Sequence, residues 1–317
     1  MDIDLADLRA HPSSDVFEEV LAEVADDVRE LVGVGEVADY IPALARVPAD
    51  RFGMAVADLH GDLHTVGEAD RPFSIQSISK VFSLILATQR FEGDLWDRVG
   101  REPSGDPFNS LVQLEHECGV PRNPFINAGA IVIADVLSSC LADPLGELVA
   151  LVSELAGAEI PIDGEVARSE ASTGYRNRSL ANLMKAFGNI QGEPDDVLDI
   201  YFAQCALTMS ARQLATALRF LANDGVDPAS GHRVLDVEKA RRINALMLTC
   251  GTYDAAGEFA FRVGIPCKSG VGGGIVGVIP HHLTACAWSP ALDRTGNSVA
   301  GRAAIEQLVE RTGLSVF

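Results

Sequence analysis

The fold is decided by the stretch Pro72-Phe73-Ser74-Ile75-Gln76-Ser77-Ile78-Ser79-Lys80, which leads into an apolar run over residues 81–87. A helix beginning near Ser77 would place Ser77 and Lys80 on neighbouring turns of one face, with hydroxyl and amine within reach of each other. This Ser-x-x-Lys spacing is typical of serine acyl-transfer enzymes. Because the run is apolar almost all round, it predicts a helix buried in a large domain.

A lysine at the head of a buried helix can act as a base only if its pKa is lowered. An ordinary lysine is neutral about one time in 10³ at pH 7. Burial and nearby cations would lower the pKa of Lys80, and the positive helix end beside Ser77 suits a developing oxyanion. The simpler alternative is a serine that caps the helix, followed by a solvated lysine. The motif alone leaves both interpretations open.

The composition excludes several classes of protein. The 317 residues include 45 acidic and 25 basic side chains, giving a net charge of −20, so nucleic acid and anionic membranes are not expected partners. The acidic N-terminus lacks the features of a secretory signal, and no apolar run is long enough to span a bilayer. The six cysteines form no Cys-x-x-Cys pair and are typical of a reduced, cytoplasmic protein. No metal motif is present, and His281-His282 is interpreted as a turn.

The periodicity of apolar residues predicts an α/β (α+β) protein in which strands lie at both ends of the chain. Residues 52–58 and 63–66 predict a hairpin, and residues 263–269, 274–279 and 283–288 predict three further strands. Helices are predicted over residues 14–32 and 299–312, and residues 77–250 appear helical with no convincing strand pair. The strands predict a five-stranded antiparallel sheet flanked by helices and interrupted by an inserted helical lobe.

This arrangement predicts one domain made of two lobes. The single domain would cover residues 1–317, with a sheet lobe over about 1–76 and 258–317 and a helical lobe over about 77–257. A cleft between lobes is a usual place for a small-molecule site.

A second lysine motif lies in the predicted sheet. Lys268-Ser269-Gly270 is a close variant of the Lys-Thr-Gly triad that accompanies Ser-x-x-Lys in penicillin-binding proteins and β-lactamases. A cation on this strand could help to lower the pKa of Lys80, and the glycines that follow allow a substrate to approach backbone N–H groups. The alternative is a glycine-rich turn between strands.

Several longer motifs, in the same order, give the chain a resemblance to the serine-dependent glutaminases, relatives of the β-lactamase and penicillin-binding-protein fold. They are Ala38-Asp39-Tyr40-Ile41-Pro42, Phe73 to Lys80, Asn123 to Ala130, Ser169-Glu170, Arg176-Asn177, Tyr201, Cys250 to Asp254 and Lys268 to Gly274. The resemblance covers most of the chain. It implies hydrolysis of L-glutamine to L-glutamate and ammonia, without a metal or organic cofactor, by a homodimer or homotetramer.

The resemblance also implies a role for each residue of the site. Ser77 would be the nucleophile, Lys80 its base and Tyr253 a proton carrier, with the N–H groups of Ser77 and Val271 as the oxyanion hole. Lys268, Ser269 and Gly270 would support the site. The residues implied to hold the amino acid are Tyr40, Asn127, Glu170, Asn177 and Tyr201.

The chemistry of the residues agrees with these roles. Glu170 offers an anion for the α-ammonium group, and the amides and tyrosines offer neutral donors for the α-carboxylate. Each residue also has a structural alternative: Asn177 could cap a helix, Tyr201 could pack in the core, Asn127 could begin a helix, and Glu170 could be a solvated loop acid.

Two rival functions remain open. A β-lactamase-like or other serine amidohydrolase would use the same Ser-Lys dyad, although the chain lacks a Ser-Asp-Asn triad. An inactive amino-acid sensor on the same fold would need no base, which the presence of Lys80 argues against.

Overall fold

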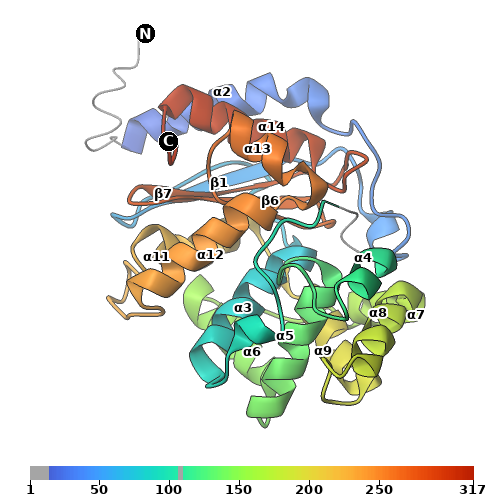
Figure 1. Cartoon of the computed structure of the whole chain (residues 1–317). Helices are drawn as coiled ribbons and strands as arrows, with labels where there is room; N and C mark the ends of the chain where they lie inside the picture. The colour runs from blue at the N-terminus through green and yellow to red at the C-terminus, as the bar shows by residue number, and fades with distance from the viewer. Residues whose placement is uncertain (1–13, 106–109) are drawn as a thin grey trace.

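The computed structural model describes residues 14–105 and 110–317. Its centre is a five-stranded antiparallel sheet with the strand order β2-β1-β7-β6-β5. The bounds of the strands, in chain order, are β1 Gly53–Asp58, β2 Leu63–Gly67, β5 Cys267–Ser269, β6 Gly274–Ile279 and β7 Leu283–Trp288. The predicted sheet is therefore confirmed, and β1 from the start of the chain lies directly beside β7 from its end (Figure 1).

One predicted strand is much shorter than expected. Residues from Val263 were expected to be extended, but Val263 is the C-cap of helix α13 (Ala256–Arg262) and β5 begins only at Cys267. Gly264 takes a φ of +67°, and Pro266 has no N–H to donate to a neighbouring strand. The chain therefore turns between the helix and the strand.

Helices cover both faces of the sheet. Helices α2 (Ser14–Asp27) and α14 (Val299–Thr312) pack side by side on one face, where they bury a core with the sheet (Figure 1). The helix predicted to reach residue 32 ends at Asp27 and is followed by a 3₁₀ turn, Arg29–Leu31. The predicted helix at residues 299–312 is confirmed.

The other face carries the inserted helices. The central pair, α3 (Ser79–Arg90) and α5 (Asn127–Cys140), is buried almost all round and packs together. The surrounding helices are α4 Leu111–His116, α6 Pro144–Ala156, α7 Gly164–Thr173, α8 Tyr175–Ala186, α9 Pro194–Cys205, α10 Ala211–Ala217, α11 Arg219–Ala222 and α12 Val237–Cys250. A short strand pair, β3 (Phe73–Ser74) with β4 (Thr208–Met209), was not predicted. It holds the chain just before Ser77.

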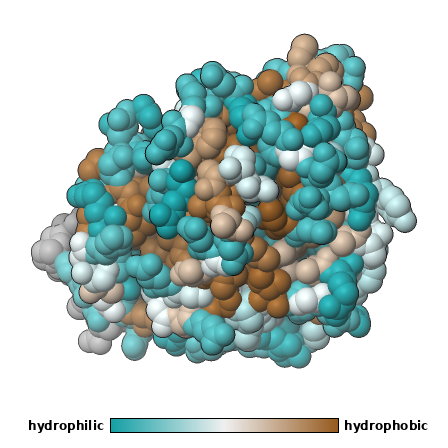
Figure 2. All heavy atoms as spheres, turned by 90° about the horizontal axis from the view of Figure 1, so that it is seen from below, coloured by the Kyte–Doolittle hydropathy of each residue, from teal (hydrophilic) through white to brown (hydrophobic). Residues whose placement is uncertain are grey.

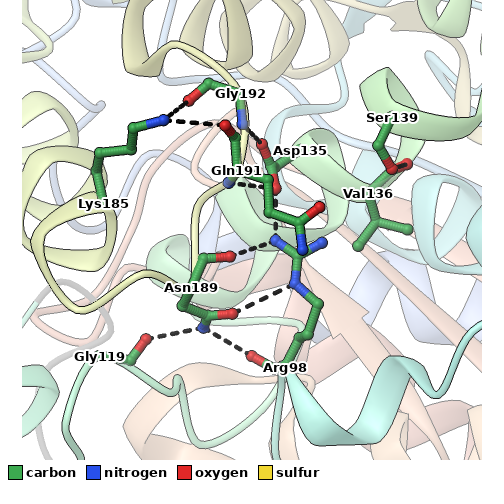
Figure 3. Close-up of polar contacts among 9 residues, drawn as sticks. All are labelled: Arg98, Gly119, Asp135, Val136, Ser139, Lys185, Asn189, Gln191 and Gly192. Atoms are coloured by element: carbon green, nitrogen blue, oxygen red, sulfur yellow. Dashed lines mark hydrogen bonds and ion pairs between the residues drawn. The ribbon is translucent and has the colours of Figure 1, made fainter.

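A buried ion pair ties helix α5 to two loops. Arg98 pairs with Asp135 on α5, whose side chain is 1% exposed, and also contacts Asn189 (Figure 3). The Asp135 carboxylate accepts further hydrogen bonds from the backbone N–H groups of Gln191 and Gly192, at 3.1 and 2.7 Å. These bonds satisfy both carboxylate oxygens, as a buried charge requires. Asp135 lies two turns along the helix from Asn127, the first residue of α5.

The surface of the helical part is mainly polar. Seen from below, hydrophilic side chains surround separate hydrophobic areas rather than one continuous apolar band (Figure 2). Within residues 14–105 and 110–317, no single helix has the length and apolar character needed to cross a bilayer. In the same part of the chain, the consecutive helices α5 and α6 reach the required length and apolar character only when they are taken together, and the chain bends by 106° between them.

Candidate active site

The chain enters the site through a strained turn immediately before Ser77. β3 leads to the 3₁₀ turn Gln76–Ile78, and α3 then begins at Ser79, two residues later than predicted. Gln76 has a φ of +50°, which is uncommon for a residue other than glycine. Ser77 is 8% exposed and lines a cavity of about 230 Å³. Its side chain makes no helix-capping hydrogen bond, so the capping alternative is wrong.

Lys80 lies beneath this cavity and is 1% exposed, so the solvated alternative is also wrong. Its Nζ donates hydrogen bonds to Asn127 Oδ1 at 2.8 Å and to the Phe125 carbonyl at 3.2 Å. Burial lowers the pKa of Lys80 to about 8, although the negative charge of Glu170 partly opposes the shift. Roughly a tenth of the amine is therefore neutral at pH 7, about a hundred times more than for an exposed lysine.

Tyr253 is the group in direct contact with Ser77. The two side chains are hydrogen-bonded, and the Tyr253 hydroxyl also donates to the Ser269 carbonyl at 3.2 Å. Among the described residues, no hydrogen bond joins the Ser77 hydroxyl directly to the Lys80 amine. Burial raises the pKa of Tyr253, so its phenol is neutral at pH 7 and can accept one hydrogen bond while it donates another.

Lys268 supports Tyr253 from below. Its Nζ lies 4.5 Å from the centre of the Tyr253 ring and donates to the carbonyls of Gly251 and Ser269 at 2.9 and 2.6 Å. Burial, and then the charge of Lys80, lowers the pKa of Lys268 well below its usual value. The charges of the two lysines therefore disfavour each other, while burial is the main cause that lowers the pKa of Lys80.

Two glycines allow the loop after β5 to pack against the backbone that precedes Ser77. A Cβ atom on Gly270 would lie 2.5 Å from the Ile75 carbonyl oxygen, and one on Gly272 would lie 2.1 Å from the Ser74 carbonyl oxygen. Only glycine permits these contacts. They hold Val271 at the cavity wall, and no hydrogen bond from its backbone N–H is found within the described part of the chain. Residues 270–273 do form a glycine-rich turn between β5 and β6, closed by a hydrogen bond from the Gly273 N–H to the Gly270 carbonyl, and through Val271 this turn is also part of the cavity wall.

The remaining predicted residues come together around the same cavity. Its lining includes Tyr40, Asn127, Glu170, Asn177 and Tyr201 as well as Ser77, Tyr253 and Val271. The first five of these residues come, in that order, from the loop before β1 and from α5, α7, α8 and α9. Lys80, Lys268, Ser269 and Gly270 are not part of this lining and lie behind it.

Glu170 is the only carboxylate that lines the cavity among the described residues, and it is 8% exposed. Burial raises its pKa to about 7, against the opposing effects of a hydrogen bond to Gln76 and the charge of Lys80. A cation placed beside Glu170 would favour its ionised form. Glu170 belongs to helix α7, so the alternative of a solvated loop acid is wrong.

Asn177 does not cap a helix. It lies inside α8, whose N-cap is Gly174, and its Oδ1 accepts a hydrogen bond from Asn127 Nδ2 at 3.0 Å. Asn127 therefore links Asn177 to Lys80. Asn127 also begins its helix and Tyr201 also packs in the core, so for these two residues the structural and the binding interpretations both hold.

Several lining residues were missed by the sequence analysis. Gln76 and Arg176 are the most notable, because they are neighbours of the predicted residues Ser77 and Asn177. The other missed residues of the cavity wall are Ile41, Thr173, Gly174 and Cys205. Arg176 is the only guanidinium group in this lining. Ile41, Gln76 and Arg176 lie within the quoted motifs, which was a usable signal, because residues next to a functional side chain often share its cavity.

The comparisons with known proteins agree with this geometry. The Glutaminase family profile matches residues 35–317. A glutaminase of Paraburkholderia phytofirmans is 53% identical over 302 residues, covering 95% of this chain and 99% of the relative, and one of Aeromonas salmonicida is 55% identical over 301 residues, covering 94% and 98%.

Solved structures extend the similarity to the fold. A probable glutaminase from Bacillus subtilis, complexed with 6-diazo-5-oxo-L-norleucine, aligns with a TM-score of 0.86 at 33% identity, covering 96% of this chain and 98% of that one. A Bacillus subtilis glutaminase in covalent complex with 5-oxo-L-norleucine aligns with a TM-score of 0.85 at 33% identity, covering 95% and 99%. The architecture is thus the β-lactamase-like fold of bacterial glutaminases. The chain belongs to the glutaminase family, whose members are hydrolases that act on glutamine.

Proposed function

We propose that this glutaminase hydrolyses the side-chain amide of L-glutamine through an acyl-enzyme formed on Ser77. The observation that carries the proposal is the position of Ser77, which lines one cavity together with a buried anion, Glu170, and lies close to a lysine whose pKa is about 8. Such a cavity suits a free amino acid whose ammonium group pairs with the carboxylate while its side chain reaches the serine. A relative's covalent complex with a norleucine derivative supports a covalent route.

In the first step, the Ser77 oxygen attacks the side-chain carbonyl carbon of glutamine. Its proton passes to the neutral Lys80 amine, with Tyr253 as the carrier, since the tyrosine is hydrogen-bonded to Ser77. The N–H groups of Ser77 and Val271 stabilise the oxyanion. Protonation of the leaving nitrogen releases ammonia, and water then attacks the ester to release L-glutamate and restore Ser77.

The binding of the amino acid follows from the remaining lining residues. Glu170 pairs with the α-ammonium group, which also keeps its own carboxylate ionised. Tyr40, Asn127, Asn177 and Tyr201 supply neutral donors for the α-carboxylate. Arg176 adds a positive charge in the same lining and favours an anionic group at that end.

Two substitutions separate the chemistry from the binding. Ser77→Ala should lower kcat at least about 10³-fold while glutamine still binds, because only the attacking oxygen is removed. Glu170→Gln should raise KM by about 10- to 100-fold, because the α-ammonium group loses its counter-charge. Ammonia release and calorimetric binding of glutamine measure the two effects.

The results also distinguish the rival functions. Retained turnover in Ser77→Ala would exclude Ser77 as the nucleophile, and an unchanged KM in Glu170→Gln would exclude Glu170 from binding. Cleavage of nitrocefin without ammonia release from glutamine would favour a β-lactamase-like enzyme. Glutamine binding by the pure wild-type protein without any ammonia would favour a sensor.

We also propose that the protein is a cytoplasmic homodimer or homotetramer. All six cysteines are free thiols, which is consistent with a reducing compartment. Exposed apolar side chains such as Phe261 and Tyr175, which are 86% and 75% exposed, are consistent with self-association. Light scattering during size-exclusion chromatography measures the mass, and a purely monomeric peak at micromolar concentration would contradict the proposal.

A further inference from the structure

The hairpin that joins β1 to β2 brings three metal-ligating side chains together. The ligand atoms of Asp58, Asp62 and His64 all lie within 4.8 Å of one another. Asp58 ends β1, Asp62 lies in the turn just before β2, and His64 is the second residue of β2. The tight connection between β1 and β2 therefore gathers the three side chains at one end of the hairpin.

His64 is buried at this position with its Nε2 atom lacking a hydrogen-bond partner among the described residues. Its side chain is 4% exposed, it packs against the Phe17 ring at 5.3 Å, and its Nε2 has no partner within the described residues. Buried polar groups are nearly always satisfied, so an orphaned imidazole nitrogen beside two carboxylates indicates a missing partner. Neutral imidazole is the commonest nitrogen ligand for metals in proteins.

Asp58 is held in place by the turn itself. Its Oδ1 accepts hydrogen bonds from the backbone N–H groups of His60, Gly61 and Asp62, each at 2.9 Å. The carboxylate is 5% exposed, and these bonds fix its orientation while its second oxygen remains available. Asp62 is exposed, so it can move to close the site and leave an open position for water.

We propose that Asp58, Asp62 and His64 form a binding site for a divalent transition-metal ion such as Zn²⁺ or Mn²⁺. Two carboxylates balance the charge of the ion, and the imidazole favours these metals over Mg²⁺ or Ca²⁺. The ion would fasten the hairpin at the end of the sheet. Since β2 and β5 are the opposite edges of the sheet, this site is separate from the loop that carries Val271, and its role is structural.

The test uses the full chain without an affinity tag, stripped with a chelator and kept reduced. Mn²⁺ titration followed by electron paramagnetic resonance should show binding, and Zn²⁺ at about a hundred times its Kd should raise the melting temperature by about 3 °C. Asp62→Asn and His64→Gln should each weaken binding at least about tenfold. Mg²⁺ should give no comparable shift.

The matched control is His232→Gln, which replaces an exposed histidine outside the hairpin and should bind both ions as the wild type does. Asp62→Asn keeps the test informative if His64→Gln destabilises the core, because Asp62 is exposed. Unchanged Mn²⁺ affinity in Asp62→Asn, or no Mn²⁺ binding by the wild type, would overturn the proposal. Zn²⁺ binding that persists in both variants would place the ion elsewhere, for example on the exposed thiols of Cys118 and Cys140.

Discussion

At the scale of single residues, the candidate site contains two ionisable groups, Lys80 and Glu170, whose charged forms are disfavoured by burial. Among residues 14–105 and 110–317, no carboxylate is hydrogen-bonded to Lys80, which is held instead by an amide oxygen and a carbonyl. Glu170 lies in the same region with a pKa of about 7, compared with about 8 for Lys80. Because the two values lie close together, modest changes of pH alter which groups carry charge.

The dependence of kcat on pH should report the protonation of Lys80. Below pH 8 the amine gains a proton and can no longer act as a base, so kcat should fall by about tenfold for each unit of pH. In Glu170→Gln this limb should move to lower pH, because the Glu170 charge raises the pKa of Lys80. Steady-state ammonia release from pH 5.5 to 9 measures this limb in the wild type and in Glu170→Gln. A kcat that is constant between pH 6 and 8 would rule out Lys80 as the base.

At the scale of secondary-structure elements, the loop of residues 270–273, which carries the proposed oxyanion donor Val271, depends on its contact with β3, the strand before Ser77. Gly272→Ala would bring a Cβ atom 2.1 Å from the Ser74 carbonyl oxygen, so the loop must move and carry Val271 away from Ser77. We expect kcat to fall by about 10²- to 10³-fold, as when one oxyanion donor is lost. Gly257→Ala in α13 is the matched control, since nothing lies within 4 Å of its Cβ. Equal activities of the two variants would show that the loop contact is dispensable.

The buried pair between Arg98 and Asp135 should stabilise helix α5 and the loops around it. Arg98→Leu would leave the Asp135 carboxylate buried without its counter-charge, so we expect a loss of about 3 kcal/mol in the free energy of unfolding. Urea denaturation measures the loss. Arg242→Leu removes an exposed pair with Glu238 and should cost under about 1 kcal/mol. Similar losses in both variants would mean that burial of the pair contributes nothing.

At the scale of the whole molecule, the net charge of −20 should dominate the response to salt. Mutual repulsion of like charges destabilises a compact protein, and salt screens this repulsion over about 10 Å at 0.1 M. We expect the melting temperature to rise between about 0.02 and 0.5 M NaCl. Differential scanning calorimetry measures the change. A fall would show instead that exposed ion pairs, such as Arg242 with Glu238, contribute more than the repulsion.

The sequence by itself determined the family, the fold class and most of the secondary structure. The strands at residues 274–279 and 283–288 and the last helix were predicted with their observed bounds, because short apolar runs bounded by turn residues and helical periodicity are local signals. The motifs around Ser77, Lys80 and Lys268 were recognisable because their chemistry requires particular residues at particular spacings.

Only the tertiary structure decided how these residues meet. The burial of Lys80, the contact between Ser77 and Tyr253, and the inclusion of Arg176 in the cavity depend on segments as far apart in the chain as Tyr40 and Val271. The same applies to His64, whose orphaned nitrogen becomes visible only once Phe17 and the hairpin enclose it. A pKa or an unsatisfied atom is a property of the surrounding packing, and packing between distant segments leaves no local periodicity to read.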